Sequence, residues 1–140
     1  MAETPIAVRE LVAFCHRSGD IDQRFQASPT AADGQRGHRE VAERRPAGWE
    51  AEVALSHRWS DGRRALLLRG RADGVDRSAA VVEEIKTCRV DPGRMPAALS
   101  RQHLAQGRLY AAMLAQDEDL PAVTVRLTWY QLDSGDEHTL

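Results

Sequence analysis

The chain has 140 residues and a formal net charge of −2, with 42% apolar and 29% charged residues, which is typical of one globular domain with a single core. No run of about 18 apolar residues occurs and the N-terminus lacks the segments of a secretory signal, so we expect neither a membrane span nor secretion. The two cysteines, Cys15 and Cys88, are far apart, which argues for a reducing, cytoplasmic environment and against a zinc or iron–sulfur site made by this chain alone.

The charges are distributed unevenly. Nine arginines and five acidic residues fall between Arg36 and Arg71, enough for a local basic face, although an ordinary solvated surface explains this pattern equally well. The chain has eighteen arginines and a single lysine, Lys86. A lone lysine indicates a position that needs a compact ammonium rather than a guanidinium, although chance would also leave one lysine somewhere.

Hydrophobic spacing predicts helices in the first third of the chain. Apolar residues at helical intervals predict a first helix over residues 5–17, which the Ser-Gly-Asp segment at residues 18–20 would end. Residues 27–37, rich in small residues, predict a loop that leads into a second helix over residues 37–45.

Strand patterns follow. Residues 49–59, 64–72 and 79–88 predict three strands, joined by turns at residues 60–62 and 74–78, that form an antiparallel meander. The longest helix is predicted over residues 97–116, and a last strand over residues 122–132 would lie beside the third strand, with the helix as its crossover. The predicted order ααβββαβ describes an α/β (α+β) domain whose mixed central sheet is flanked by helices.

One pair of strands carries candidate catalytic residues. Strand alternation places Glu84 and Lys86 on the same face, and the hairpin would bring Asp73, at the end of the preceding strand, close to Glu84. Clustered carboxylates repel unless a cation lies between them, and their oxygens suit Mg²⁺ or Mn²⁺. Such a cation would activate water for attack on a phosphodiester, while Lys86 holds that water or stabilises charge on the phosphate.

The alternative for a Glu-x-Lys pattern is a solvated strand face with a cross-strand ion pair, and taken alone this alternative is the commoner one. Three features favour a site instead. The strand begins with an apolar run at residues 79–82, where unpaired charges would be costly; Lys86 is the only lysine; and Gly70 and Gly74 flank Asp73, which permits the close approach of a ligand.

Four short segments together resemble a known family. The sequences GRADG at residues 70–74 and VEEIKT at residues 82–87 resemble the central motif of the PD-(D/E)XK nuclease superfamily, in particular its RecB-like branch. GQRGH at residues 34–38 resembles the upstream GxxxH element of that branch, and QGRLY at residues 106–110 resembles its downstream QxxxY element. Each segment alone is weak evidence, but four in the expected order are specific.

The resemblance implies a restriction-endonuclease-like PD-(D/E)XK core and roles for individual residues. The implied metal ligands are His38, Asp73, Glu84 and the backbone carbonyl of Ile85. The implied catalytic residues are Asp73, Glu84 and Lys86. Strand alternation directs Glu83 to the opposite face, so Glu84 is the expected ligand. Without the motif, His38 would be interpreted as a surface histidine near the start of a helix.

Two residues of the predicted long helix complete the implied site. Gln106 and Tyr110 are four residues apart and share one helix face, where they would orient the active-site groups or contact the DNA backbone. Without the motif both would be interpreted as ordinary helix surface. Residues 8–12 and 127–133 extend the resemblance, more narrowly, to the nuclease domain attached to DinG-like DNA helicases. The chain lacks the four cysteines of the iron–sulfur cluster found in some RecB-like nucleases.

The resemblance implies that residues 1–140 form a single nuclease domain, and the end of the chain just past a turn suggests a domain cut from, or fused to, a longer helicase–nuclease chain. We expect a DNA nuclease that requires Mg²⁺ or Mn²⁺, with exonuclease action on single- or double-stranded DNA, in repair or recombination. Its helicase partner would lie in cis or in trans, since the only lysine is not in a P-loop. Two alternatives stay open: a catalytically weak DNA-binding module that guides strands for a helicase, and a plain interaction domain whose acidic residues pair with arginines.

Overall fold

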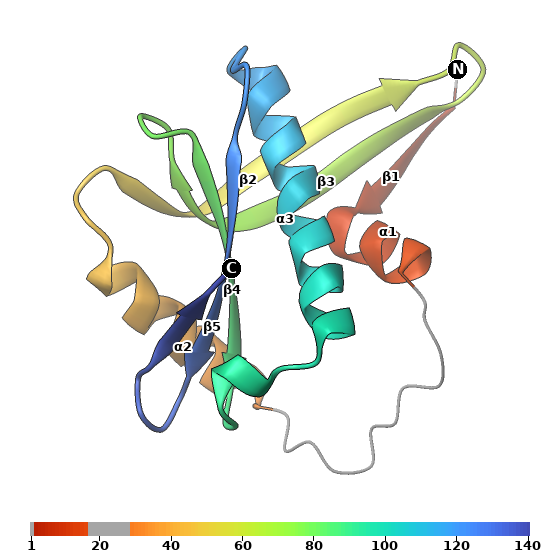
Figure 1. The fold of residues 1–140 in the computed structure, drawn as a ribbon. Helices are drawn as coiled ribbons and strands as arrows, with labels where there is room; N and C mark the ends of the chain where they lie inside the picture. Colours follow the sequence, from red (N-terminus) through yellow and green to blue (C-terminus); the bar gives the residue numbers. More distant parts are fainter. Residues whose placement is uncertain (1, 17–28) are drawn as a thin grey trace.

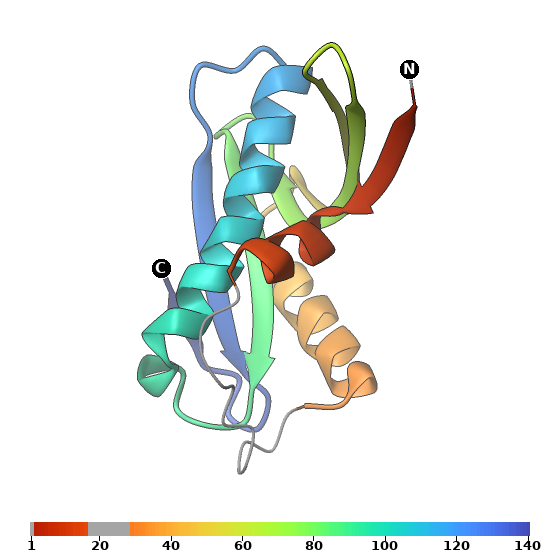
Figure 2. The ribbon, with the colours of Figure 1, turned by 90° about the vertical axis from the view of Figure 1, so that its right-hand side faces the viewer.

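The computed structural model describes residues 2–16 and 29–140 (Figure 1). A mixed six-stranded sheet has the strand order β1-β3-β4-β5-β6, with β2 paired to β3. Helices cover both faces of this sheet, as the two orthogonal views show (Figures 1 and 2). No helix in the described part of the chain combines the length and the apolar character needed to cross a membrane.

The described elements follow one another in an order that begins and ends with a strand. In chain order they are β1 (Glu3–Ala7), α1 (Val8–Cys15), α2 (Ala31–Arg44), β2 (Trp49–Ser60), β3 (Ala65–Asp76), β4 (Val81–Cys88), the 3-10 helix η1 (Pro92–Arg94), α3 (Ala97–Asp117), β5 (Thr124–Gln131) and β6 (Glu137–Thr139). The mixed central sheet with flanking helices confirms the coarse fold prediction. The meander β2-β3-β4 is antiparallel, and α3 crosses over to place β5 parallel to β4, both as predicted.

The predicted order ααβββαβ is wrong at both ends, because β1 precedes α1 and β6 follows β5. Residues Glu3–Ala7 pair in parallel with the first part of β3, so the helix predicted over residues 5–17 begins only at Val8. Pro5, which has no N–H, is tolerated in β1 because this strand lies at the edge of the sheet. β6 has only three residues, Glu-His-Thr, and becomes a strand only by pairing with β5. The predicted stop at residues 18–20 lies outside the described residues.

Helix α2 begins earlier than predicted, at Ala31 rather than at Gly37. Thr30 and Asp33 form a capping box, in which the Asp33 N–H donates to Thr30 Oγ1 over 3.1 Å and the Thr30 N–H donates to Asp33 Oδ2 over 3.2 Å. Gly37 allows the helix to lie close to the sheet, since a Cβ atom there would be 2.4 Å from Thr87 Cγ2 of β4. These features set the position of the following residue, His38.

Strand β3 is longer than predicted and contains Gly74, which had been assigned to a turn. Along one edge β3 pairs with β2 over nearly its whole length. Along the other edge, β1 pairs with residues 65–69 and β4 pairs with residues 74–76. Among the described strands, therefore, none pairs with residues 70–73 on that second edge, and the sheet has a gap there.

The two faces of the sheet have separate cores. On one face α1 and α3 cover the larger core, whose fully buried members include Val8, Ala72, Val82 and Leu114. On the other face α2 covers a smaller cluster of Val41, Ile85, Tyr130 and Leu132. Successive residues of β4 therefore face different helices, as strand alternation requires.

Glu83 lies on the α2 face and confirms the prediction that it points away from Glu84. It is 1% exposed, and it accepts hydrogen bonds from Arg45 over 2.7 and 3.0 Å and from Thr128 Oγ1 over 2.7 Å. Arg45 also bonds to Glu137 of β6 over 2.6 Å. These hydrogen bonds join the end of α2 to β4, β5 and β6. The charges can be buried because each has a hydrogen-bonded partner of opposite sign.

We expect Glu83→Gln to lower the free energy of unfolding by about 3 kcal/mol, because it leaves the buried Arg45 guanidinium without its main charged partner. Urea denaturation at neutral pH measures the change. The matched control is Glu52→Gln, which alters an exposed pair whose nitrogen and oxygen are 3.9 Å apart, and it should change stability by no more than about 0.5 kcal/mol. Equal effects of the two substitutions would contradict a structural role for Glu83.

Candidate active site

Where β3 and β4 diverge, the Asp73 side chain replaces a backbone carbonyl as the hydrogen-bond acceptor for β4. The regular pairing of the two strands ends at Gly74 and Glu83, and the N–H of Ile85 then donates to Asp73 Oδ2 over 2.7 Å. Beyond this point β4 runs beside β5 and away from β3 (Figure 1). The prediction that Asp73 ends its strand is wrong, because Asp73 lies inside β3. It approaches Glu84 at the point where the two strands diverge.

Glu84 and Lys86 project together from β4, as predicted, and form an ion pair in which Nζ and Oε1 are 2.8 Å apart. Glu84 is 2% exposed, and its second oxygen, Oε2, is buried without a hydrogen-bond partner in the described structure. Helix α3 lies directly over it, since a Cβ atom on Gly107 would be 3.8 Å from Glu84 Cβ. An unpaired buried carboxylate oxygen is costly, so it marks a position suited to a further cation or donor.

His38 comes from α2 on the other face of the sheet and reaches the same place. Its Nδ1 lies 3.4 Å from Asp73 Oδ1, and both side chains are partly exposed. The gap in the sheet makes this contact possible, because a continuous β3–β4 ladder would separate the two faces. The structure therefore brings together four of the residues implied by the resemblance, from three different elements: His38, Asp73, Glu84 and Lys86.

Gln106 and Tyr110 are buried on α3 and do not form ordinary helix surface. Gln106 Nε2 donates to the Tyr110 hydroxyl over 3.2 Å. Tyr110 packs against Gly70 in the gap of the sheet, where a Cβ atom would lie 2.5 Å from Tyr110 Cε1. Burial raises the pKa of Tyr110, the hydrogen bond from Gln106 lowers it, and the charges of Glu84 and Asp73 raise it further. This placement suits a residue that orients the site better than one that contacts DNA.

The two carboxyl groups disfavour each other's charge. Burial raises the pKa of Glu84 to about 7, and the negative charge of Asp73 adds to this effect while Lys86 opposes it. Burial likewise raises the pKa of Asp73, opposed by the charge of His38 and by the hydrogen bond from Ile85. A cation near both groups would remove their repulsion and stabilise the ionised forms.

The donor types at this position fit a divalent metal ion. Two carboxylates suit Mg²⁺ or Mn²⁺, an imidazole favours Mn²⁺, and the unpaired Glu84 Oε2 supplies a buried acceptor. The N–H and C=O of one strand residue face the same neighbour, so the Ile85 carbonyl also faces the gap. Within the described residues, no three His, Cys, Asp or Glu side chains are already arranged closely enough to hold a metal ion.

Two further residues at the site were missed in the sequence. Arg9, in the first turn of α1, is close enough to lower the pKa of both Glu84 and His103. Burial is the main reason that the pKa of His103 falls to about 3. His103 lies three residues before Gln106 on α3, a helical spacing that could have identified it. Arg9 belongs to residues 8–12, which extend the family resemblance, but its place at the site depends on the pairing of β1 beside the gap.

A cavity of about 470 Å³ opens beside these residues, and its wall includes His38, Ile85, Lys86, Arg9 and His103. Lys86, whose side chain is 22% exposed, lines this cavity and also forms the ion pair with Glu84.

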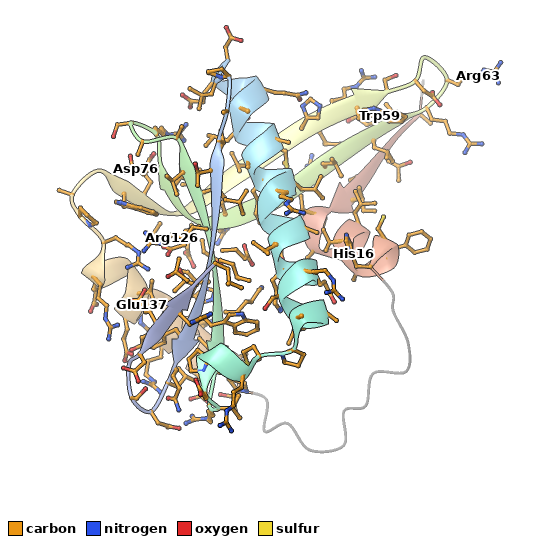
Figure 3. The ribbon with its side chains drawn as sticks, in the orientation of Figure 1. His16, Trp59, Arg63, Asp76, Arg126 and Glu137 are labelled. Carbon is orange, nitrogen blue, oxygen red and sulfur yellow. The ribbon has the colours of Figure 1, made fainter. Side chains whose placement is uncertain are left out.

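The arginines between Arg36 and Arg71 are divided between α2 and the β2–β3 hairpin, with Arg63 at the far tip of the hairpin (Figure 3). Five of them form ion pairs with acidic residues: Arg36 with Glu40, Arg44 with Glu137, Arg45 with Glu83, Arg58 with Glu3, and Arg71 with Glu52. The ordinary-surface interpretation of this arginine-rich segment is therefore the better supported one.

Comparison with known proteins identifies a shared fold. No family model matches the sequence, and no curated protein matches it either. The crystal structure of SSO0001 is similar, with a TM-score of 0.67 and 23% sequence identity, over 100% of this chain and 68% of that chain. At this level of identity the likeness shows the fold alone.

We expect stability in EDTA to depend on pH through Glu84. Its pKa of about 7 in the folded protein exceeds the usual glutamate value of 4.5, so its contribution to stability is full below pH 4.5 and is lost as the pH rises through 7. Between pH 5 and pH 8 the wild type should lose about 1–3 kcal/mol more unfolding free energy than Glu84→Gln. Urea denaturation at both pH values tests this, with Glu43→Gln, at an exposed site on α2, as the control. Parallel losses in wild type and Glu84→Gln would contradict it.

Proposed function

We propose that this chain is a divalent-metal-dependent DNA nuclease of the PD-(D/E)XK superfamily, RecB-like branch. The observation that carries the proposal is the convergence of His38, Asp73, Glu84 and Lys86 at the gap in the sheet. Neither carboxylate of this group forms an ion pair with an arginine in the described structure, which separates it from the ion-paired surface elsewhere on the molecule. Buried carboxyl groups with raised pKa values are typical of functional sites.

Each residue has a role that follows from its position. Asp73, Glu84 and His38 would hold Mg²⁺ or Mn²⁺, with the Ile85 carbonyl facing the same gap. A bound ion of this kind polarises a phosphodiester and lowers the pKa of its bound water. The hydrogen bond from Ile85 restrains Asp73, and α3 restrains Glu84 from the other side.

Lys86 is the residue best placed to contact the substrate. An ammonium has three N–H donors; one bonds to Glu84 Oε1, and the side chain also lines the cavity. Its remaining donors can orient an attacking water or bond to a phosphate oxygen as negative charge develops there. A guanidinium is larger and planar, which accounts for a lysine here in a chain that otherwise uses arginine.

The second candidate is a catalytically weak DNA-binding module that guides strands for a helicase. It is favoured by the net charge of −2 and by the ion-paired arginines, which leave little excess positive charge for a substrate channel. The plain interaction domain is less well supported, because Asp73 and Glu84 have no arginine partners in the described residues. Exonuclease action, a helicase in cis or in trans and a role in DNA repair are proposed on the family resemblance.

Cleavage of end-labelled single- and double-stranded DNA in Mn²⁺ and Mg²⁺ tests the proposal. We expect Lys86→Ala and Asp73→Ala each to lower the cleavage rate by at least about 100-fold. The first removes the ammonium that stabilises negative charge on the phosphate, and the second removes a ligand of the metal ion. Lys86→Arg should also be strongly impaired, whereas Glu43→Gln should cleave like the wild type. A wild type that binds DNA without metal-dependent cleavage would favour the strand-guiding module. A wild type that neither binds nor cleaves DNA would refute both candidates.

Metal binding can be measured without DNA. We expect saturating Mn²⁺ to raise the unfolding free energy, by about 2.7 kcal/mol at a hundred times its Kd. Asp73→Asn should abolish this shift, and His38→Ala should reduce the preference for Mn²⁺ over Mg²⁺, because Mn²⁺ accepts an imidazole nitrogen more readily than Mg²⁺ does. Thermal unfolding with and without each ion is the measurement. The absence of any shift in the wild type would instead support the interaction domain.

A further inference from the structure

We propose that the cavity beside Lys86 binds a single unpaired nucleotide at the end of a DNA strand, with its phosphate between Arg9 and Lys86 and its base against the apolar wall. The inference rests on the proposed nuclease function and adds to it a substrate class: strands with an unpaired end.

The size and position of the cavity limit what it can hold. Its volume of about 470 Å³ lies in the range of about 300–1,000 Å³ that is usual for small-molecule sites. A nucleotide fits in this space, whereas a double helix, whose major groove alone is about 12 Å wide, does not. His38, Ile85 and Lys86 belong both to the cavity wall and to the candidate active site. A nucleotide bound here would therefore place its phosphodiester beside the clustered carboxylates.

Two cationic side chains of the cavity wall, Lys86 and Arg9, also act on the candidate active site, since the charge of each lowers the pKa of Glu84. Lys86 projects from β4, and Arg9 projects from the first turn of α1. The neighbouring Val8 is fully buried, which holds this turn against the core and leaves Arg9 exposed at the cavity. A guanidinium and an ammonium on one phosphate form charge-assisted hydrogen bonds, and the guanidinium can bond in a bidentate manner.

Arg89, a further arginine of the wall, is already engaged. It forms ion pairs with Asp33 over 3.1 Å and with Asp133 over 2.6 Å. Within the described residues Arg9 forms no ion pair with a carboxylate, so it is the arginine of this wall that can accept a phosphate without breaking an existing pair.

The rest of the wall suits a base. Met95 and Leu99 line it and pack against Trp129, which is 3% exposed. The His103 ring meets Trp129 edge to face with 5.4 Å between ring centres, and its low pKa keeps it uncharged at neutral pH. His103 Nδ1 is buried without a hydrogen-bond partner in the described structure, which is costly, and a bound ligand removes this cost by supplying a partner. The Met95 and Leu99 side chains of this wall can contact the face of a base, and apolar contact of this kind does not distinguish between the bases.

The test uses the whole chain in EDTA with deoxyadenosine 5′-monophosphate as the probe, and binding is followed by NMR or calorimetry. We expect wild type to bind, and Leu99→Trp, which fills the cavity, to weaken binding at least tenfold. Arg9→Gln should weaken it to a similar extent through loss of the phosphate contact; because Arg9 is exposed, this variant does not disturb the core. Arg108→Gln, on the exposed side of α3 and outside this cavity, is the matched control and should bind like the wild type.

No binding by the wild type, or equal binding by wild type, Leu99→Trp and Arg9→Gln, would overturn the inference. Mn²⁺-dependent stabilisation and Mn²⁺-dependent cleavage of linear DNA are measured beside it. A wild type that binds Mn²⁺ and cuts linear DNA, but does not bind the nucleotide, leaves the nuclease proposal intact and refutes the cavity. Cavity-dependent nucleotide binding without metal-dependent cleavage supports the cavity and refutes the nuclease.

Discussion

The hydrogen bond from the Ile85 N–H to the Asp73 carboxylate marks the place where the central sheet divides. A strand that leaves its neighbour exposes backbone groups, and a buried N–H without a partner is costly. Asp73 satisfies that N–H with a side chain, so β4 can leave β3 and continue beside β5. The gap at residues 70–73, the approach of Tyr110 over Gly70 and the access of His38 from α2 all depend on this division.

The division of the sheet also explains the electrostatics of the candidate site. Groups from two faces of a sheet are normally kept apart by its backbone. Here Asp73 and Glu84 share a largely buried space with one lysine and one histidine, and burial raises the pKa of both carboxyl groups. The fold thus holds two carboxyl groups close enough to disfavour ionisation, although two free carboxylates in water would repel each other and separate. Carboxyl groups with pKa values perturbed in this way are common at sites that bind a cation or perform acid–base chemistry.

Adjacent residues of β4 illustrate how partners decide the role of a buried charge. Glu83 is fully matched by Arg45 and Thr128 and stabilises the junction of α2 with the sheet. Glu84, on the opposite face, keeps one oxygen without a partner in the described structure. The two side chains have the same chemistry and nearly the same burial, so the difference lies in the helices that each one faces.

The sequence by itself determined the elements whose hydrophobic period is long and regular, namely α3 and the strands β2 to β5, and it indicated Glu84 and Lys86 on one strand face. These features depend on neighbours along the chain. Only the tertiary structure decided that β1 and β6 are strands, that Asp73 lies inside β3, and that Arg9 and His103 border the same cavity. Short strands and cross-chain contacts have no local signal, because the hydrogen bonds and packing that create them come from residues far away in the sequence.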